Sequence, residues 1–293
     1  MVRDKSVGGM IFDVFNHILL ALVSLACIVP VLHTLFCSLS DPVLLARHSG
    51  IMLWPQGFSL KGYELVAGNR SILSGYLNTI LYVVVGTALS ILLTSMGAFV
   101  CSRRQFRLRR PMMLMIVFTM YFSGGLIPLY LVVKGLGLLD TRMAMILPSA
   151  ISAWNLILLN TAFSEVPVSL EESAKIDGAN DFTVLFRIFI PVSRASIAVM
   201  LLLYAVGQWN SWFNAMIFLR SRDLYPLQLI LKEILVQNDT SVMSTIANQS
   251  EMDIYRPLVK YCTVIVSIVP IIIVYPFVQK HFVKGMMIGA VKG

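Results

Sequence analysis

Charged and small residues with helix-forming spacing concentrate in one stretch of an otherwise apolar chain, between Val166 and Pro191. Ser169 and Glu172 have the spacing of a capping box, in which a hydroxyl and a carboxylate each accept a hydrogen bond from a free backbone N–H at a helix start. Gly178 can adopt the left-handed conformation that closes such a helix. These residues indicate a binding function, because they would present one short, charged helix to a partner.

A second short helix is predicted after this glycine. Asn180 or Asp181 can cap it, apolar residues follow at helical spacing, and Pro191 ends it. Periodicity alone allows two interpretations of the pair, a helical hairpin that rests on the membrane surface or a docking element for another protein. The residues by themselves leave both open.

The order of residues in this stretch resembles the EAA loop of bacterial ABC importer permeases. Glu172-Ser173-Ala174, three residues, Gly178, nine residues and Ile188 to Pro191 follow the family's pattern E-A-A-x3-G-x9-I-x-L-P, with serine for the middle alanine and isoleucine for leucine. In that family the loop is a coupling helix seated in a cleft of the ATPase subunit. The resemblance implies these coupling residues: Glu171, Glu172, Ser173, Ala174, Asp177, Gly178, Ile188 and Pro191.

The composition is that of an integral membrane protein. Of 293 residues, 57% are hydrophobic and 13% are charged, which is too few polar residues to cover a soluble globule. The net charge of +8 does not indicate nucleic-acid binding, because the basic residues gather at the ends of apolar segments, as membrane orientation requires.

The apolar segments predict an all-α chain with six transmembrane helices in a single domain, residues 1–293, and the resemblance implies that this domain has the type I ABC importer permease fold. A hydrocarbon layer of roughly 30 Å takes about 20 residues of helix. We expect a cytoplasmic coupling loop at about 163–193, and a third span broken near Ser123-Gly124-Gly125 and Pro128. The expected spans are about 11–39, 75–100, 112–133, 143–162, 194–219 and 257–278.

Five arginines after the second span fix the predicted orientation. By the positive-inside rule they lie in the cytoplasm, which places both termini and the coupling loop there as well. We interpret them as a topology anchor without a ligand. They are Arg103, Arg104, Arg107, Arg109 and Arg110.

Few residues within the spans indicate chemistry. His33 lies in the first span, where we expect a neutral histidine bonded to a neighbouring helix in preference to a functional group. The four cysteines form no C-x-x-C pair, so neither a metal site nor a disulfide is predicted. Phosphate-loop and zinc-protease motifs are absent, so the chain itself is not predicted to be an enzyme or to hold a cofactor.

The fifth span is the candidate for contact with a solute. Asn210 and Asn214 share a helix face at i,i+4, and sugars are commonly held by amide hydrogen bonds and aromatic faces. The alternative is helix-to-helix amide bonding, with tryptophans in the aromatic belt. The candidate pathway residues are Tyr121, Trp209, Asn210, Trp212 and Asn214.

Further segments, including GGLIPLYLVVKGLGLLDTR, WNSW and MMIGAVKG, resemble carbohydrate-importer permeases of the maltose type, those for complex polysaccharides among them. The resemblance implies a type I ABC importer in the bacterial inner membrane that carries an oligo- or polysaccharide. Its partners would be a second homologous permease, two ATPase subunits holding ATP and Mg, and an extracytoplasmic solute-binding protein. A terminal contact with the ATPases is implied for Gly285, Gly289, Lys292 and Gly293.

Two alternatives stay open from the sequence. The EAA pattern is shared by permeases for amino acids, peptides, ions and polyamines, so the solute need not be a sugar. An ion-coupled secondary carrier is the alternative from another class, although the carboxylates lie almost entirely in loops and no buried relay of titratable residues is evident.

Overall fold

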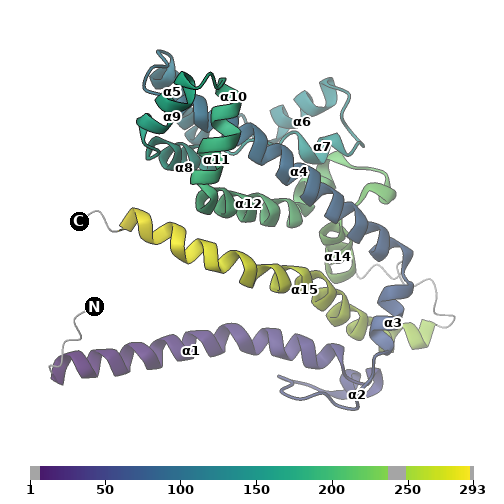
Figure 1. Ribbon diagram of the computed structural model, residues 1–293. Helices are drawn as coiled ribbons and strands as arrows, with labels where there is room; N and C mark the ends of the chain where they lie inside the picture. Colours follow the sequence, from purple (N-terminus) through teal and green to yellow (C-terminus); the bar gives the residue numbers. More distant parts are fainter. Residues whose placement is uncertain (1–6, 237–248, 291–293) are drawn as a thin grey trace. The chain divides into compact units, whose positions relative to one another are not determined.

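Helices make up nearly all of the computed structural model, which describes the backbone of residues 7–236 and 249–290 and the side chains of residues 8–236 and 254–276. Among these residues the only strand-like pairing is an isolated bridge between Ser40 and Phe58. The chain, coloured along its sequence in Figure 1, divides into two units. The predicted all-α class is confirmed.

The first unit comprises the described residues among Met1–Asn69 and Ile234–Ile268. It begins with helix α1 (Val7–Ser38), whose apolar side chains are exposed along most of its length, as expected of a helix surrounded by lipid. Two short helices follow, α2 (Pro42–Arg47) and α3 (Lys61–Gly68). Asp41 caps α2 by accepting hydrogen bonds from the backbone N–H groups of Val43 and Leu44.

His33 makes structural contacts in this unit, although its hydrogen bond goes to a loop and not to the neighbouring helix that the sequence analysis expects. Its Nδ1 accepts a hydrogen bond from the backbone N–H of Met52 at 2.9 Å. Its ring also meets Tyr261 of helix α15 (Gln249–Ala290) edge-on, with centroids 5.8 Å apart. Near the same end of α1, Ser38 and Tyr63 share a hydrogen bond of 2.7 Å.

The second unit comprises the described residues among Arg70–Glu233 and Val269–Gly293, and it is organised around α4 (Arg70–Ser102). Helices α8 (Ala153–Ser164) and α12 (Arg194–Trp209) pack along α4. Polar groups on α4 bind the 3-10 helix η2 (Arg222–Leu224) and the residues after it: Asn78 donates to the carbonyl of Asp223 at 2.6 Å, and Thr79 accepts from the N–H of Leu227 at 2.8 Å. The segment leads into α14 (Leu227–Val236).

Several predicted spans of the second unit are broken helices. The third is interrupted where the sequence indicates, because Gly125, with φ of +84°, separates α5 (Arg109–Tyr121) from α6 (Leu126–Gly135) at a bend of 115°. The fourth is not one continuous helix: α7 (Met143–Ile146) ends well before α8. The fifth is divided, because α12 stops at Trp209 and α13 runs from Trp212 to Phe218.

Length and composition identify three helices that are able to cross a membrane within the described part of the chain. These are residues Gly8–Ser38, Arg70–Ser102 and Ile254–Pro276. Counting two bent pairs as single spans raises the number to five; one is α5 with α6, and the other joins Asp181–Val192 to α12 through a bend of 88°. The six-span arrangement stays a prediction.

Candidate functional site

The charged stretch forms two short helices joined by a tight turn. Helix α9 (Val168–Ile176) is closed by Gly178, which has φ of +82°, as the sequence predicts. Asn180 then caps α10 (Asp181–Val184) by accepting a hydrogen bond from the N–H of Thr183 at 2.8 Å. In Figure 1 these helices lie at one end of α4, near the loop that leads to α5.

The predicted capping box is wrong. Helix α9 begins at Val168 with Pro167 at its N-cap position, and no side chain accepts a hydrogen bond there. Ser169 therefore lies inside the first turn, where its hydroxyl is not placed to cap. Proline at this position has a fixed φ, and the helix starts two residues earlier than the box requires.

The second short helix also runs further than predicted. It continues from α10 through a π-helical turn, η1 (Leu185–Phe189), and ends after α11 (Ile190–Val192), one residue beyond Pro191. Within η1 the N–H of Ile190 bonds to the carbonyl of Leu185, a five-residue spacing. Pro191 has no N–H to donate, and the chain bends at Ser193 into α12.

The predicted coupling residues divide into an outer and an inner set. Glu172, Ser173, Asp177, Gly178 and Pro191 are exposed, whereas Ala174 and Ile188 are half-buried and Glu171 is buried. Of the large apolar side chains exposed on the same short helices, three have exposed fractions of 86%, 61% and 46%. An exposed surface that combines carboxylates with such apolar groups is suited to docking. The three are Ile176, Phe182 and Phe186.

The inner side of the loop carries a charge cluster that the sequence analysis missed. Arg103 pairs with Glu171 and, at 3.3 Å, with Asp181. Lys175 pairs with Glu171 at 3.2 Å and with Asp181 at 3.7 Å. We call these four residues the ion quartet. The sequence analysis assigned Arg103 only an anchoring role; spacing gave no signal of these ion pairs, because the partners lie far along the chain.

An apolar core fastens the loop to the helices beneath it. Phe189 meets the rings of Phe99 on α4 and Phe163 on α8 edge-on, with centroids 4.9 and 5.5 Å apart. Val184 and Leu185 are buried in the same cluster.

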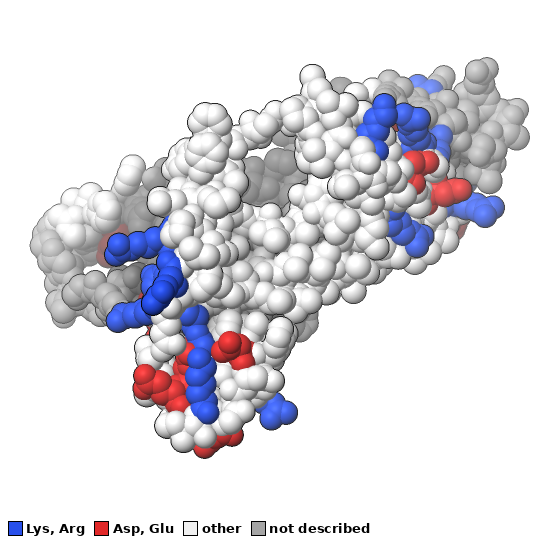
Figure 2. Space-filling model, turned by 90° about the horizontal axis from the view of Figure 1, so that it is seen from above, with Lys and Arg blue, Asp and Glu red and all other residues white. Residues whose placement is uncertain are grey.

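On the surface, Figure 2 shows that Lys and Arg side chains lie beside carboxylates in patches on the face in view, with uncharged surface around them.

A polar pocket of about 500 Å³ opens elsewhere in the second unit, between α8 and the break that separates α12 from α13. Two predicted pathway residues, Asn210 and Asn214, line it. The sequence analysis did not select the other polar lining residues, which come from two separate segments of the chain and meet only in the fold. They are Ser149, Ser152, Asn155, Tyr204, Gln208 and Ser211.

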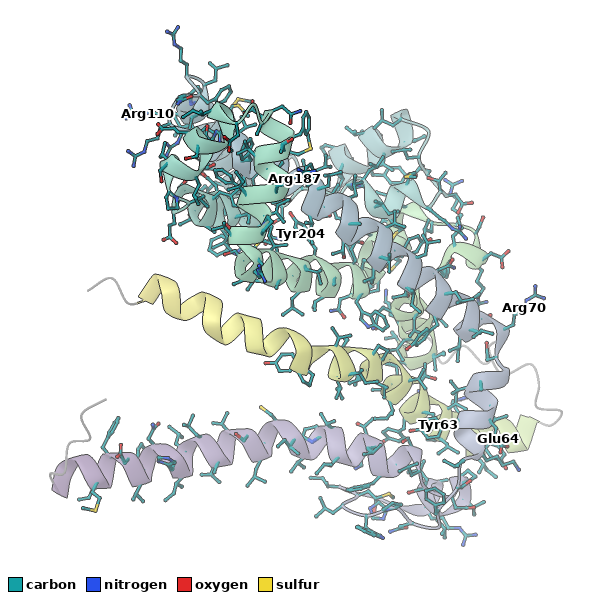
Figure 3. The ribbon with its side chains drawn as sticks, in the orientation of Figure 1. Tyr63, Glu64, Arg70, Arg110, Arg187 and Tyr204 are labelled. Atoms are coloured by element: carbon teal, nitrogen blue, oxygen red, sulfur yellow. The ribbon has the colours of Figure 1, made fainter. Side chains whose placement is uncertain are left out.

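Hydrogen bonds hold the wall of the pocket in place. Tyr204, labelled on α12 in Figure 3, shares a hydrogen bond of 2.6 Å with Thr94 of α4 and accepts one from the N–H of Ser152 at 3.1 Å. Gln208 donates to the hydroxyl of Ser149 at 2.9 Å, while its buried Oε1 has no protein partner. A buried amide oxygen without a partner is costly, so a water or a ligand hydroxyl is its natural complement.

The other predicted pathway residues lie outside this pocket. Trp209 is buried and meets Tyr76 edge-on, with centroids 6.0 Å apart. Trp212 packs on Phe213, and the Lys232 ammonium lies 4.4 Å from its ring centre. Tyr121, 84% exposed, ends α5 away from the pocket lining. The pocket thus brings together the amides of the fifth segment but not its indoles.

The loop between α6 and α7 is fastened by one carboxylate. Asp140, which has φ of +57°, accepts hydrogen bonds from the backbone N–H groups of Arg220 and Ser221 and from the Ser221 hydroxyl. These bonds, led by that from the Ser221 hydroxyl, lower the pKa of Asp140 from its ordinary value of 3.8. The sequence analysis did not single out this residue.

The terminal candidates are only partly described. Gly285 and Gly289 lie within α15, which continues to Ala290. Lys292 and Gly293 lie outside the described residues.

The long apolar helices and the nearly all-helical fold place the chain among helical integral membrane proteins. Residues 86–288 match the family described as binding-protein-dependent transport system inner membrane component. The chain belongs to this family, so it is an integral inner-membrane component of a transport system that works with a binding protein, and the sequence-based resemblance is confirmed.

Two relatives align with this chain over nearly the whole length of both proteins. The chain is 40% identical over 288 residues to the polygalacturonan/rhamnogalacturonan transport system permease protein YtcP of Bacillus subtilis, covering 97% of this chain and 99% of that protein. It is 39% identical to protein LplC of the same organism, over 98% and 96% of the two chains. Among solved structures, a bacterial ABC transporter involved in the import of the acidic polysaccharide alginate matches with a TM-score of 0.86 and 32% identity, over 95% and 99% of the chains.

Proposed function

We propose that this chain is the permease subunit of an ATP-driven importer that carries an oligo- or polysaccharide across the inner membrane. The observation that carries the proposal is the full-length similarity to a permease named for polygalacturonan and rhamnogalacturonan transport, at 40% identity. The likeness to an alginate importer supports the same class of solute. The three named solutes, polygalacturonan, rhamnogalacturonan and alginate, are acidic polysaccharides, so fragments of pectin-type chains are the first candidates.

Energy for the transport comes from partner subunits in this proposal. Two ATP-binding subunits hold ATP and Mg and dock on the exposed surface of the coupling loop, which carries Glu172, Asp177 and the apolar side chains of Ile176 and Phe182. A second homologous permease completes the membrane part, and an extracytoplasmic binding protein delivers the solute. The terminal residues 285–293 are proposed to reach the ATPases as well.

The orientation is part of the proposal. The five arginines between α4 and α5 support a cytoplasmic position for that loop by the positive-inside rule. Arg103 pairs directly with the coupling loop, so the two loops share one side of the membrane. Both termini then lie in the cytoplasm if six spans are present.

The polar pocket beside α8 and α12 is the proposed contact with solute in this chain. Its lining offers amides and hydroxyls, the groups that bind sugar hydroxyls, and none of its described lining residues is charged. Asn210 and Asn214 are the candidate ligands, and Gln208 contributes a buried Oε1 without a protein partner. The pocket would thus bind the hydroxyl groups of an acidic saccharide and not its carboxylates.

Uptake by the reconstituted complex tests the proposal. The permease pair, its ATPases and the binding protein are placed in vesicles and supplied with labelled oligogalacturonides or neutral oligosaccharides of equal length. ATP-dependent, vanadate-sensitive uptake of either sugar supports it. Uptake of a non-sugar solute instead, or uptake driven by an ion gradient through this chain alone, would overturn it.

A further inference from the structure

Two adjacent carboxylates of α9 have opposite environments. Glu172 is exposed, whereas the side chain of Glu171 is 9% exposed and contacts Arg103 and Lys175. Glu172 is thus free to meet a partner protein. Glu171 is committed to contacts within this chain, so the two glutamates have different roles.

Arg103 joins three elements of the second unit through one guanidinium group. It follows the last residue of α4, contacts Glu171 on α9, and contacts Asp181 at the first position of α10. Its own side chain is 13% exposed. The guanidinium therefore connects the end of a membrane-spanning helix to both helices of the coupling loop.

Aromatic rings hold this guanidinium in one position. The Arg103 guanidinium carbon lies 4.4 Å from the ring centre of Phe99 and 5.6 Å from that of Phe189. Contacts of this type stabilise the planar guanidinium and restrict its orientation. Its Nη2 thus donates a hydrogen bond to Asp181, at 3.3 Å, and its Nη1 forms an ion pair with Glu171, before any partner binds.

The remaining contacts between the loop and α4 are apolar. Phe189 packs on Phe99, and Val184 and Leu185 are buried beside them. Apolar contacts are non-directional and tolerate sliding, whereas charge-assisted hydrogen bonds of a guanidinium fix the relative position of the groups that they join. When α9 is displaced, the ion quartet is therefore what makes α4 move with it by the same amount.

We propose that Arg103 is the positioning residue that makes the coupling loop move as one body with α4, so that it sets how much transport each ATP hydrolysed drives. The inference rests on the proposed function, because it assumes that an ATPase acts on the exposed surface of α9. Arg103 does not contact the ATPase or the solute. Its loss leaves docking intact and makes the transmitted movement incomplete.

Substitution of Arg103 in the assembled, reconstituted transporter provides the first test. Arg103→Ala is compared with Arg104→Ala, which removes an adjacent but exposed arginine. We expect Arg103→Ala to raise the ATP hydrolysed per sugar transported by about fivefold or more, with the amount of complex and basal ATPase activity unchanged. Arg103→Lys should fall between the wild type and Arg103→Ala, because lysine keeps the charge but loses the planar fork.

A second measurement does not depend on transport. Hydrogen exchange of the backbone amides of residues 168–176 in the assembled complex reports how firmly α9 is held. We expect about tenfold faster exchange in Arg103→Ala, and no change in Arg104→Ala. If wild-type complexes move no sugar, the proposed function fails, yet this comparison still decides the role of Arg103.

The outcomes separate as follows. Faster exchange together with a raised ratio of ATP to sugar supports the proposal, and so does the same pattern in Glu171→Gln should Arg103→Ala fail to assemble. An unchanged ratio in both Arg103→Lys and Glu171→Gln overturns it. Lower assembly with a normal ratio per complex also overturns it, because Arg103 would then serve folding alone.

Discussion

Gly86 of α4 and Gln208 of α12 lie so close that a Cβ atom on the glycine would meet Nε2 of the glutamine at 2.8 Å. This approach lets Gln208 reach the Ser149 hydroxyl, at 2.9 Å, and places its other amide atom at the polar pocket. Because Gly86 has no side chain, Gln208 of α12 can take this position in the wall of the pocket.

Gly86→Ala should distort this wall. The added methyl group displaces the Gln208 amide and breaks its bond to Ser149, at a cost of about 1–3 kcal/mol of stability. The measurement is the thermal unfolding midpoint of the purified complex together with sugar uptake. Gly207→Ala is the control for stability alone, because the residue also lines the pocket; no atom lies within 4 Å of a Cβ there, so the unfolding midpoint should hold or rise. Equal effects of the two changes would contradict the prediction.

Gly178→Val should weaken the coupling of ATP hydrolysis to transport. Valine at a φ of +82° costs about 1–3 kcal/mol of backbone strain, and no neighbouring atom lies within 4 Å of a Cβ there, so the effect is one of conformation and not of collision. Uptake per complex is measured with ATPase activity. Gly178→Asn should retain most activity, since asparagine tolerates the left-handed region. Wild-type uptake by the valine variant would refute this.

Asn210→Leu and Asn214→Leu should each lower uptake by about three- to tenfold without reducing the assembled complex, because each removes one amide from the pocket. Initial rates at varied sugar concentration give the affected constant. Trp212→Phe serves as a control, since Trp212 is not among the residues that line the pocket and its ring faces Lys232. Normal transport by both asparagine variants would show that the solute path lies on other residues or in the partner permease.

Asp140 gives the protein a pH-dependent contribution to stability. Its pKa is lower in the folded state, so the stabilisation is complete above the unfolded value near 3.8 and is lost as the pH falls from there through the folded pKa. Asp140→Asn should therefore lower the unfolding midpoint at pH 7, with the difference from wild type narrowing only below pH of about 4. Asp223→Asn, an exposed neighbour, is the control. A difference that is independent of pH would argue against the carboxylate.

The sequence by itself determined the features that depend on local chemistry. A run of apolar residues reveals a spanning helix wherever it folds, because the bilayer selects for length and hydropathy. Gly178 and Asn180 could be assigned from the turn and the cap that they form with their immediate neighbours, and the coupling-loop pattern is contiguous. These predictions need no knowledge of what packs against the segment.

Only the tertiary structure decided the contacts between distant segments. Arg103 meets Glu171 and Asp181, and Tyr204 joins Thr94 to Ser152, across separations that no local pattern encodes. The same holds for Trp209, whose indole looks suited to a sugar in sequence but is buried against Tyr76. A helix face carries several polar or aromatic groups, and the packing of neighbouring helices selects which of them line a cavity and which are covered.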